Sequence, residues 1–335
     1  MVLLPVPVAF VLSCALTWAM LCGARRWGVL DRPNERSAHQ RPTPTLGGVG
    51  VVAGVWGGLA AGLATGQLET QVAWPLLAGS LLLLGSIRDD LGPPLGVGEK
   101  LLLILLACGA WLWWGPRLES LTLLGGSHLE LGLWSWPLTV LWLVWLCNVY
   151  NFMDGIDGLS GVQAIGAGAW IALWNWDSAP SLAGVGLSLG AAAAGFLVFN
   201  FPPARIFMGD VGALCLGFWL AALGVLGERA GIPLWIMALP LGCYLFDTTY
   251  TLARRVLRGE HILRAHRNHL YQRLTRAGWS HLQVDLGAGL LILLLGGSGQ
   301  AYLHGEVLGG NALLGLALLL LVGITLWIER KVPLD

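Results

Sequence analysis

Long apolar runs constrain this chain more than any other feature of its sequence. Eleven runs have close to the ~20 residues that a helix needs to cross hydrocarbon, with ~17 to 25 tolerated. They are approximately 3–23, 46–66, 72–88, 100–116, 134–152, 160–176, 182–200, 211–227, 232–252, 284–303 and 307–328. Only 11% of the residues are charged, against roughly 25% in an ordinary soluble domain. The sequence therefore predicts an all-α polytopic integral membrane protein of about 11 (10–11) transmembrane helices in a single domain, 1–335.

The basic residues predict the orientation of these helices. With eleven spans, 17 of the 19 Lys and Arg residues fall on the side of the C-terminus, and only Arg117 and Arg229 fall on the other. Because cytoplasmic loops carry an excess of Lys and Arg, we expect a cytoplasmic C-terminus and a periplasmic N-terminus. The formal net charge is zero, so no overall basic character suggests nucleic acid as a partner.

Unusual polar residues gather on the predicted cytoplasmic side, in loops at about 24–45, 88–100, 152–160, 200–211 and 253–283. The third loop lies in Asn148–Gly161, NVYNFMDGIDGLSG, between two apolar runs. Carboxylates at the edge of hydrocarbon are costly, which makes Asp154 and Asp157 functional candidates. Their spacing of three would place them on one face of a helix. The glycines beside them would let a ligand or another helix approach the backbone.

The second and fourth loops add further charged groups. Asp89 and Asp90 are adjacent carboxylates, which repel one another unless a cation, a proton or divergent orientations relieve them. Lys100 stands at the start of the next run. Asp210 lies between two glycines, where an ordinary helix N-cap is the alternative interpretation. Asn200 and Arg205 add polar groups at the same depth, which favours a functional role for Asp210.

The first and fifth loops carry histidines among basic residues. His39 lies in a proline-rich basic segment that could meet phosphates, and an ordinary positive-inside loop is the alternative. His266 and His269 are three apart, the spacing of one helical face, with Arg267 between them. A basic interfacial helix on anionic lipid would explain the arginines but would not require both histidines.

This residue set points to one type of chemistry. Oxygen ligands without thiolates favour Mg²⁺ or Mn²⁺ over zinc. A divalent ion held by carboxylates, with Lys, Arg and His near it, can neutralise the charge that develops as a phosphoryl group moves. The lipid setting suggests that one substrate is itself a lipid.

Five segments, in order, resemble the polyprenyl-phosphate N-acetylhexosamine-1-phosphate transferases of glycosyltransferase family 4. They are the RPTPTLGG turn, SIRDD, NVYNFMDGIDGLSG, PARIFMGDVGALCLG and AHRNHLYQRL, and the resemblance extends from about Arg32 to Gly278. It implies transfer of a sugar 1-phosphate from a UDP-N-acetylhexosamine to undecaprenyl phosphate, with Mg²⁺ required and UMP released. It also implies a bacterial inner (plasma) membrane enzyme, for which a homodimer stays open.

The resemblance also implies roles for individual residues. Asp210 and Asp89 match the metal site, and Asp89 is also the candidate for deprotonating or orienting the lipid phosphate. The implied catalytic residues are Asp89, Asp90, Asp154, Asp157 and His269. The implied substrate-binding residues are His39, Lys100, Asn151, Asn200, Arg205, His266 and Arg267.

Three questions stay open from the residues alone. HRNH departs from the tighter run of histidines in the enzyme that makes lipid I, and Ala213 stands where serine is common in the family. The histidine pattern and the HLYQRL continuation resemble the members that initiate O-antigen, with UDP-GlcNAc, UDP-FucNAc or UDP-QuiNAc as donor. Direct displacement on the β-phosphorus is the expected mechanism, and an aspartyl phosphate intermediate is the alternative. An ion-coupled transporter is the main alternative to an enzyme, because intramembrane carboxylates can carry ions.

Overall fold

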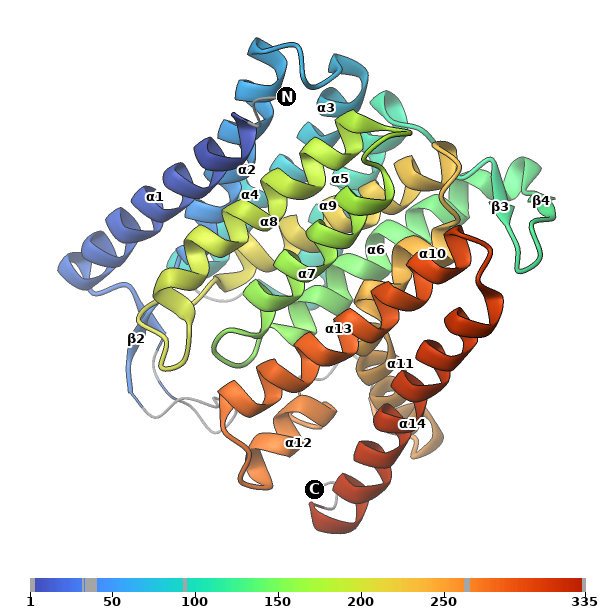
Figure 1. Ribbon diagram of the computed structural model, residues 1–335. Coiled ribbons are helices and arrows are strands. Elements are labelled where there is room, and N and C mark those ends of the chain that lie inside the picture. The colour runs from blue at the N-terminus through green and yellow to red at the C-terminus, as the bar shows by residue number, and fades with distance from the viewer. Residues whose placement is uncertain (1–3, 32, 34–40, 93–94, 262–265, 333–335) are drawn as a thin grey trace.

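The computed structural model describes residues 4–31, 33, 41–92, 95–261 and 266–332, which form a bundle of long helices (Figure 1). The elements are α1 (Pro5–Trp27), β1 (Leu30–Asp31), β2 (Thr43–Pro44), α2 (Gly47–Ala64), α3 (Thr70–Leu76), η1 (Leu77–Gly79), α4 (Ser80–Leu91), α5 (Val97–Trp114), β3 (Ser120–Thr122), β4 (His128–Glu130), η2 (Gly132–Trp134), α6 (Ser135–Met153), α7 (Leu159–Trp174), α8 (Pro180–Asn200), α9 (Gly209–Arg229), α10 (Leu234–Ala238), η3 (Leu239–Leu241), α11 (Gly242–Leu257), α12 (Leu270–Arg276), α13 (His281–Leu303) and α14 (Val307–Lys331). Strands β1 and β2 pair antiparallel, as do β3 and β4. The prediction of an all-helical polytopic protein is confirmed.

Nine helices within the described residues are long and apolar enough to cross a membrane. The other two predicted spans take different forms. Helix α7 is shorter, with 16 residues, and the run 232–252 is divided into α10, η3 and α11. Pro240 lies in η3, and proline lacks the N–H that an uninterrupted helix would use. The count of eleven spans and the predicted orientation remain predictions.

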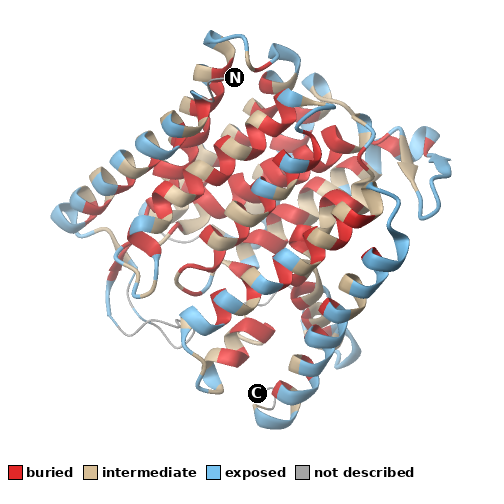
Figure 2. Cartoon of the chain, in the orientation of Figure 1, coloured by how far each residue is buried: buried red, intermediate tan, exposed pale blue. Residues whose placement is uncertain are grey.

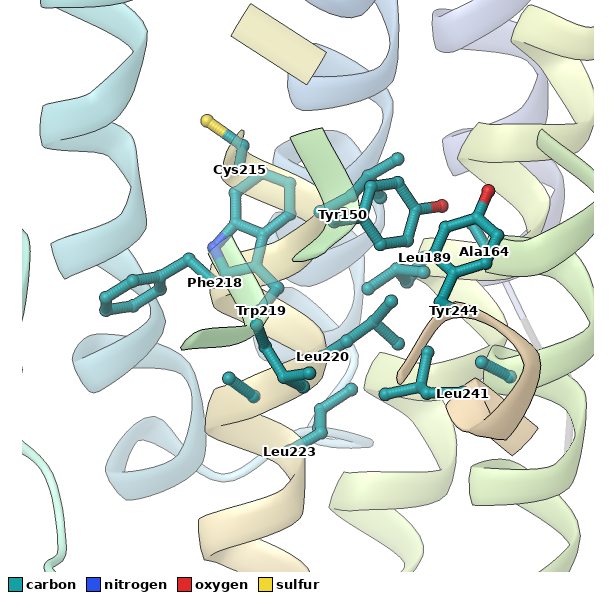
Figure 3. Close-up of a cluster of buried hydrophobic side chains, with 14 of the residues drawn as sticks. Tyr150, Ala164, Leu189, Cys215, Phe218, Trp219, Leu220, Leu223, Leu241 and Tyr244 are labelled. Atoms are coloured by element: carbon teal, nitrogen blue, oxygen red, sulfur yellow. The ribbon is translucent and has the colours of Figure 1, made fainter. Parts of the chain in front are cut away.

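Helix α9 forms the centre of the bundle. Every residue from Val211 to Gly227 is buried, and 89% of the apolar window of α9 is buried, against 17% for α14. Figure 2 shows the same contrast between a buried interior and outer helices with exposed faces. Around α9 the core is closed by aromatic and aliphatic side chains of its neighbours, among them Tyr150, Leu189 and Tyr244 (Figure 3). The apolar outer faces of α1 and α14 are therefore the surfaces left for lipid.

The start of α9 is held by backbone contacts with the start of α2. The N–H of Gly47 donates to the carbonyl of Phe207 at 2.9 Å, and that of Gly48 donates to Met208 at 2.8 Å. A Cβ on Gly48 would lie 2.2 Å from the backbone nitrogen of Gly212. Glycine at both positions lets the two backbones touch, and this contact sets where Asp210 begins its helix.

We expect Gly48→Ala to destabilise the protein, because the added methyl group forces apart two backbones that cannot yield as a flexible side chain would. Overpacking of this kind typically costs about 1–3 kcal/mol. Thermal unfolding in detergent measures the effect. Gly109→Ala is the matched control, since a Cβ at that helical position meets nothing within 4 Å. Equal unfolding midpoints for the two variants would contradict the expectation.

The described parts of the five predicted polar loops lie at one end of the bundle, with α12 and the end of α14, while the start of α1 lies at the other end (Figure 1). Long helices therefore bring together residues that are more than 100 positions apart in the sequence.

Candidate active site

A lysine lies between two carboxylates at the loop end of the bundle. The ammonium of Lys100, in the first turn of α5, is 2.5 Å from Oδ2 of Asp210 and 2.8 Å from Oδ2 of Asp89. The other oxygen of Asp89 accepts the backbone N–H of Leu95, so both of its oxygens are engaged. Three predicted site residues from α4, α5 and α9 are thus brought into direct contact.

Asn151 and Asp90 complete the surroundings of Asp210. The amide of Asn151 donates to Oδ1 of Asp210 at 3.0 Å, and the backbone N–H of Asp210 donates to Oδ1 of Asp90 at 3.3 Å. Gly209 has φ +73°, and a Cβ there would lie 2.4 Å from a carboxylate oxygen of Asp90. This position therefore needs glycine for both its conformation and its space.

Two structural expectations for this region are corrected. The N-cap of α9 is Met208 and no side chain caps it, so the alternative interpretation of Asp210 as a helix cap is wrong. Residues 154–158 are not helical, since α6 ends at Met153 and α7 begins at Leu159. Asp154 and Asp157 therefore do not share a helical face. The glycines of DGIDG favour a loop, which contacts with neighbouring segments then hold in place.

Asp157 and Asn200 tie this loop to its neighbours. Asp157 Oδ2 accepts the backbone N–H of Ala204 at 3.0 Å and lies 3.3 Å from Nδ1 of His281. Asn200 accepts the N–H of Gly158 at 2.8 Å and donates to the carbonyl of Ile206 at 2.9 Å. Both residues therefore link the α6–α7 loop to the α8–α9 loop, and these contacts give them a positioning role.

Asp154 lies close enough to Asp210 for the charge of that carboxylate to change its pKa. Although the residue as a whole is partly exposed, burial of its carboxyl, together with the negative charge of Asp210, raises the pKa of Asp154 to about 7. A carboxyl with a pKa near neutrality can accept and release a proton under working conditions.

We expect Asp154→Asn to stabilise the protein more at pH 8 than at pH 5. Because the folded-state pKa is raised, the folded protein binds more protons between about pH 4 and pH 7, and stability falls as pH rises through that window. Asparagine is neutral throughout, so it removes this penalty, which is larger at pH 8 than at pH 5. Thermal unfolding in EDTA should show a midpoint higher by roughly 2 °C at pH 8. Asp177→Asn, on an exposed turn, is the control, and a gain that is equal at both pH values would contradict the assignment.

The histidines precede α12 and do not lie on it, because that helix begins at Leu270. The expectation of a shared helical face is therefore wrong. Their rings nevertheless stack, with centroids 4.9 Å apart. Burial, with the neighbouring His269 and Arg255, lowers the pKa of His266 to about 4, so this imidazole is neutral at pH 7. His269 is bound to Asp247, as described below.

The remaining predicted residues vary in position. Arg205 is exposed at the loop end, with its guanidinium 5.4 Å from the centre of the Phe199 ring. Arg267, which lies between the two histidines in the sequence, is half-buried. His39 lies outside the described residues.

Three residues that sequence analysis did not select help to shape the site. His281 contacts Asp157, and Tyr271 donates its hydroxyl to the carbonyl of Phe152 at 3.0 Å. Asp285 is buried against Gly158, where a Cβ would lie 2.2 Å from its Oδ2. A fourth such residue, Asp247, is a carboxylate well inside an apolar run, and that is the sequence signal by which it could have been found.

The oxygen donors fit a magnesium ion that shares its coordination with substrate. Mg²⁺ is usually bound by one or two carboxylates together with substrate phosphates and water. Within the described residues, no three His, Cys, Asp or Glu side chains converge to hold a metal by themselves. Asp89 and Asp210 supply two carboxylates with a cation, the Lys100 ammonium, already between them. This pair could therefore supply two of the metal ligands, and substrate phosphates and water would supply the others.

Apolar grooves run along the sides of the bundle. One lies between α7 and α13, with a volume of about 710 Å³ and Trp170, Leu290 and Leu293 among its lining residues. Another, of about 600 Å³, follows α5 and α6. Both grooves are suited to hydrocarbon chains.

Known proteins are similar in sequence to this chain over most of its length. The family model described as glycosyl transferase family 4 matches residues 72–228. A probable undecaprenyl-phosphate N-acetylglucosaminyl 1-phosphate transferase of Bacillus subtilis (strain 168) is 31% identical over 76% of this chain and 72% of its own length. The chain belongs to glycosyl transferase family 4. The matched region of the family contains Asp89, Lys100, Asn151 and Asp210, the cluster described above.

Relatives that are named for different activities are similarly related to this chain. A phospho-N-acetylmuramoyl-pentapeptide-transferase of Synechococcus sp. (strain JA-2-3B'a(2-13)) is 34% identical over 90% of this chain and 93% of its own length. An undecaprenyl-phosphate alpha-N-acetylglucosaminyl 1-phosphate transferase of Salmonella typhi is 30% identical over 81% and 76%. The family resemblance predicted from the five motifs is thereby confirmed.

Proposed function

We propose that this protein transfers an N-acetylhexosamine 1-phosphate from a UDP-sugar to undecaprenyl phosphate at the cytoplasmic face of a bacterial inner membrane. The product would begin the synthesis of a cell-envelope polysaccharide, O-antigen among the candidates. The observation that carries this proposal is the contact of Lys100 with Asp89 and Asp210 at one end of a membrane-type bundle. The names of the relatives support the lipid acceptor and the sugar phosphate.

The proposed step is one displacement at phosphorus. An oxygen of the lipid phosphate forms a bond to the β-phosphorus of the UDP-sugar, while the bond from that phosphorus to the oxygen bridging the two phosphates breaks, and UMP leaves with the electron pair. Asp154 would accept a proton from any lipid phosphate that arrives as the monoanion. Both oxygens of Asp89 are already engaged, which leaves Asp154 the better-suited proton acceptor.

The cations of the site would hold the diphosphate. Lys100 provides a positive charge beside the carboxylate pair, and Arg205 and Arg267 lie at the same end of the bundle. His266, neutral at pH 7, would contribute a hydrogen bond. A bound Mg²⁺, held by Asp210 and Asp89, would supply further neutralisation of the charge that develops on the phosphate oxygens.

A second donor is favoured by a specific observation. The relative that aligns with this chain over 93% of its own length is named a phospho-N-acetylmuramoyl-pentapeptide-transferase. UDP-MurNAc-pentapeptide is therefore the second candidate donor. The separated histidines of HRNH favour the first candidate.

The test is transfer of radiolabel by purified protein in detergent from UDP-GlcNAc, UDP-FucNAc, UDP-QuiNAc and UDP-MurNAc-pentapeptide into undecaprenyl phosphate. We expect label in lipid and release of UMP with one N-acetylhexosamine donor, loss of both in EDTA, and recovery with Mg²⁺ or Mn²⁺. Trapping of a labelled phosphoenzyme from donor alone would replace the single displacement by a two-step route. No transfer with any donor from folded protein would overturn the proposal and favour the ion-coupled transporter.

A further inference from the structure

We propose that Asp247 is a positioning residue, which holds His269 in one tautomer and one orientation beside the reacting groups; this role rests on the proposed function. Asp247 lies in α11, 22 positions before His269, and both side chains are buried. A carboxylate in such a place is costly unless it is fully bonded.

Four donors meet this carboxylate. Its Oδ1 accepts the backbone N–H of Leu270 at 2.8 Å, Nδ1 of His269 at 3.1 Å and the hydroxyl of Thr251 at 3.1 Å. Its Oδ2 accepts the backbone N–H of Tyr271 at 3.0 Å. Two of the four donors are backbone N–H groups in the first turn of α12, which have no partner within the helix. One side chain therefore fixes both the start of α12 and the imidazole that precedes it.

This bonding pattern determines the tautomer of His269. An ionised carboxylate can only accept hydrogen bonds, so Nδ1 of His269 carries the proton. The hydrogen bond of one ring nitrogen sets the state of the other, which leaves Nε2 as the atom that can accept a proton. Among the described residues, Nε2 has no hydrogen-bonding partner. Once protonated there, the imidazolium would stay paired with Asp247 and could donate to a phosphate oxygen.

The same contacts place His269 against the end of α6. Its ring lies 5.9 Å from that of Phe152, and the hydroxyl of Tyr271 donates to the carbonyl of Phe152 at 3.0 Å. Phe152 follows Asn151, the partner of Asp210, and precedes Asp154 by two residues. Asp247 therefore acts on the site through His269, which it holds together with the start of α12, and does not touch the carboxylate cluster itself.

A double-mutant cycle tests the positioning role. We expect Asp247→Ala to lower kcat about 10- to 100-fold, the size of effect seen when a carboxylate that orients a metal-binding histidine is removed. In a His269→Ala background the same change should have an effect of no more than about threefold, because the residue through which it acts is gone. An equal loss in both backgrounds would overturn the proposal. Asp247→Asn, which keeps one acceptor oxygen, should fall between wild type and Asp247→Ala.

Thr251→Val is the matched control, because it removes another donor to Oδ1 and leaves His269 bonded. Its kcat should stay within about threefold of wild type, and a loss as large as that of Asp247→Ala would contradict the proposal.

A spectroscopic readout makes the outcome independent of turnover. In ¹⁵N-histidine-labelled wild-type protein in detergent, the His269 signals, assigned by their loss in His269→Ala, should show a protonated Nδ1 and an unprotonated Nε2. An unprotonated Nδ1 would overturn the tautomer assignment. If wild-type protein transferred no sugar phosphate, the proposed function would fail, while this spectrum would still decide how Asp247 and His269 are paired.

Discussion

Asp210→Asn should lower kcat for sugar phosphate transfer on the order of 10³-fold, which corresponds to about 4 kcal/mol of transition-state stabilisation. Asparagine has nearly the same shape, so it can still accept the hydrogen bond of Asn151. It lacks the negative charge that pairs with Lys100 at 2.5 Å and that would hold a magnesium ion. The loss should therefore appear in kcat with the fold intact, as radiolabel transfer and thermal unfolding measured on the same preparation would show.

Asp177→Asn is the control for this change, because it makes the same substitution at an exposed turn beyond α7. It should leave kcat within about twofold of wild type. A loss of less than tenfold in Asp210→Asn would remove Asp210 from the centre of the proposed mechanism. High Mg²⁺ should recover little activity, because a higher metal concentration does not replace the missing carboxylate ligand.

Lys100→Met should lower kcat/KM about 10²- to 10³-fold, the usual effect of removing a preorganised group that stabilises transition-state charge. Methionine keeps most of the side-chain volume but removes the ammonium between Asp89 and Asp210, and the two carboxylates would then repel each other. We expect Lys100→Arg to recover only part of the activity, because the planar guanidinium does not fit a site built for a point charge. Initial rates over a range of UDP-sugar concentrations measure these effects.

The other lysine of the chain, Lys331, provides the matched control. It is exposed in the last turn of α14, and Lys331→Met should have an effect of less than twofold. A Lys100→Met enzyme within tenfold of wild type would mean that the ammonium serves the fold alone.

Much of the architecture could be predicted from apolar length. The runs 46–66 and 307–328 became α2 and α14 with nearly the same bounds, because a segment of that length and composition can satisfy its backbone only as a helix in hydrocarbon. The run 232–252 was harder to predict, since its prolines divide it. The charged members of the site also stood out, because Asp89, Asp210 and Lys100 are rare residue types at the ends of apolar runs.

The local shape of the site could not be predicted from spacing. Asp154 and Asp157 have the spacing of a helical face, but contacts from Tyr271, Asn200 and His281 hold that segment as a loop. His266 and His269 have the same spacing, and α12 starts only after them because Asp247 bonds its first N–H groups. In each case a partner distant in the sequence overrides the local pattern.

By itself, the sequence determined that this protein is a helical membrane protein of the transferase family with its carboxylates at the loop ends of its helices, because hydrophobic length and residue type are local properties. Only the tertiary structure decided which of those residues meet. Lys100 bridges Asp89 and Asp210, Asp157 and Asn200 hold loops, and Asp247 orients His269. These pairings depend on how α4, α5, α9 and α11 pack, and side-chain contacts across a packed bundle are fixed by all of its helices together.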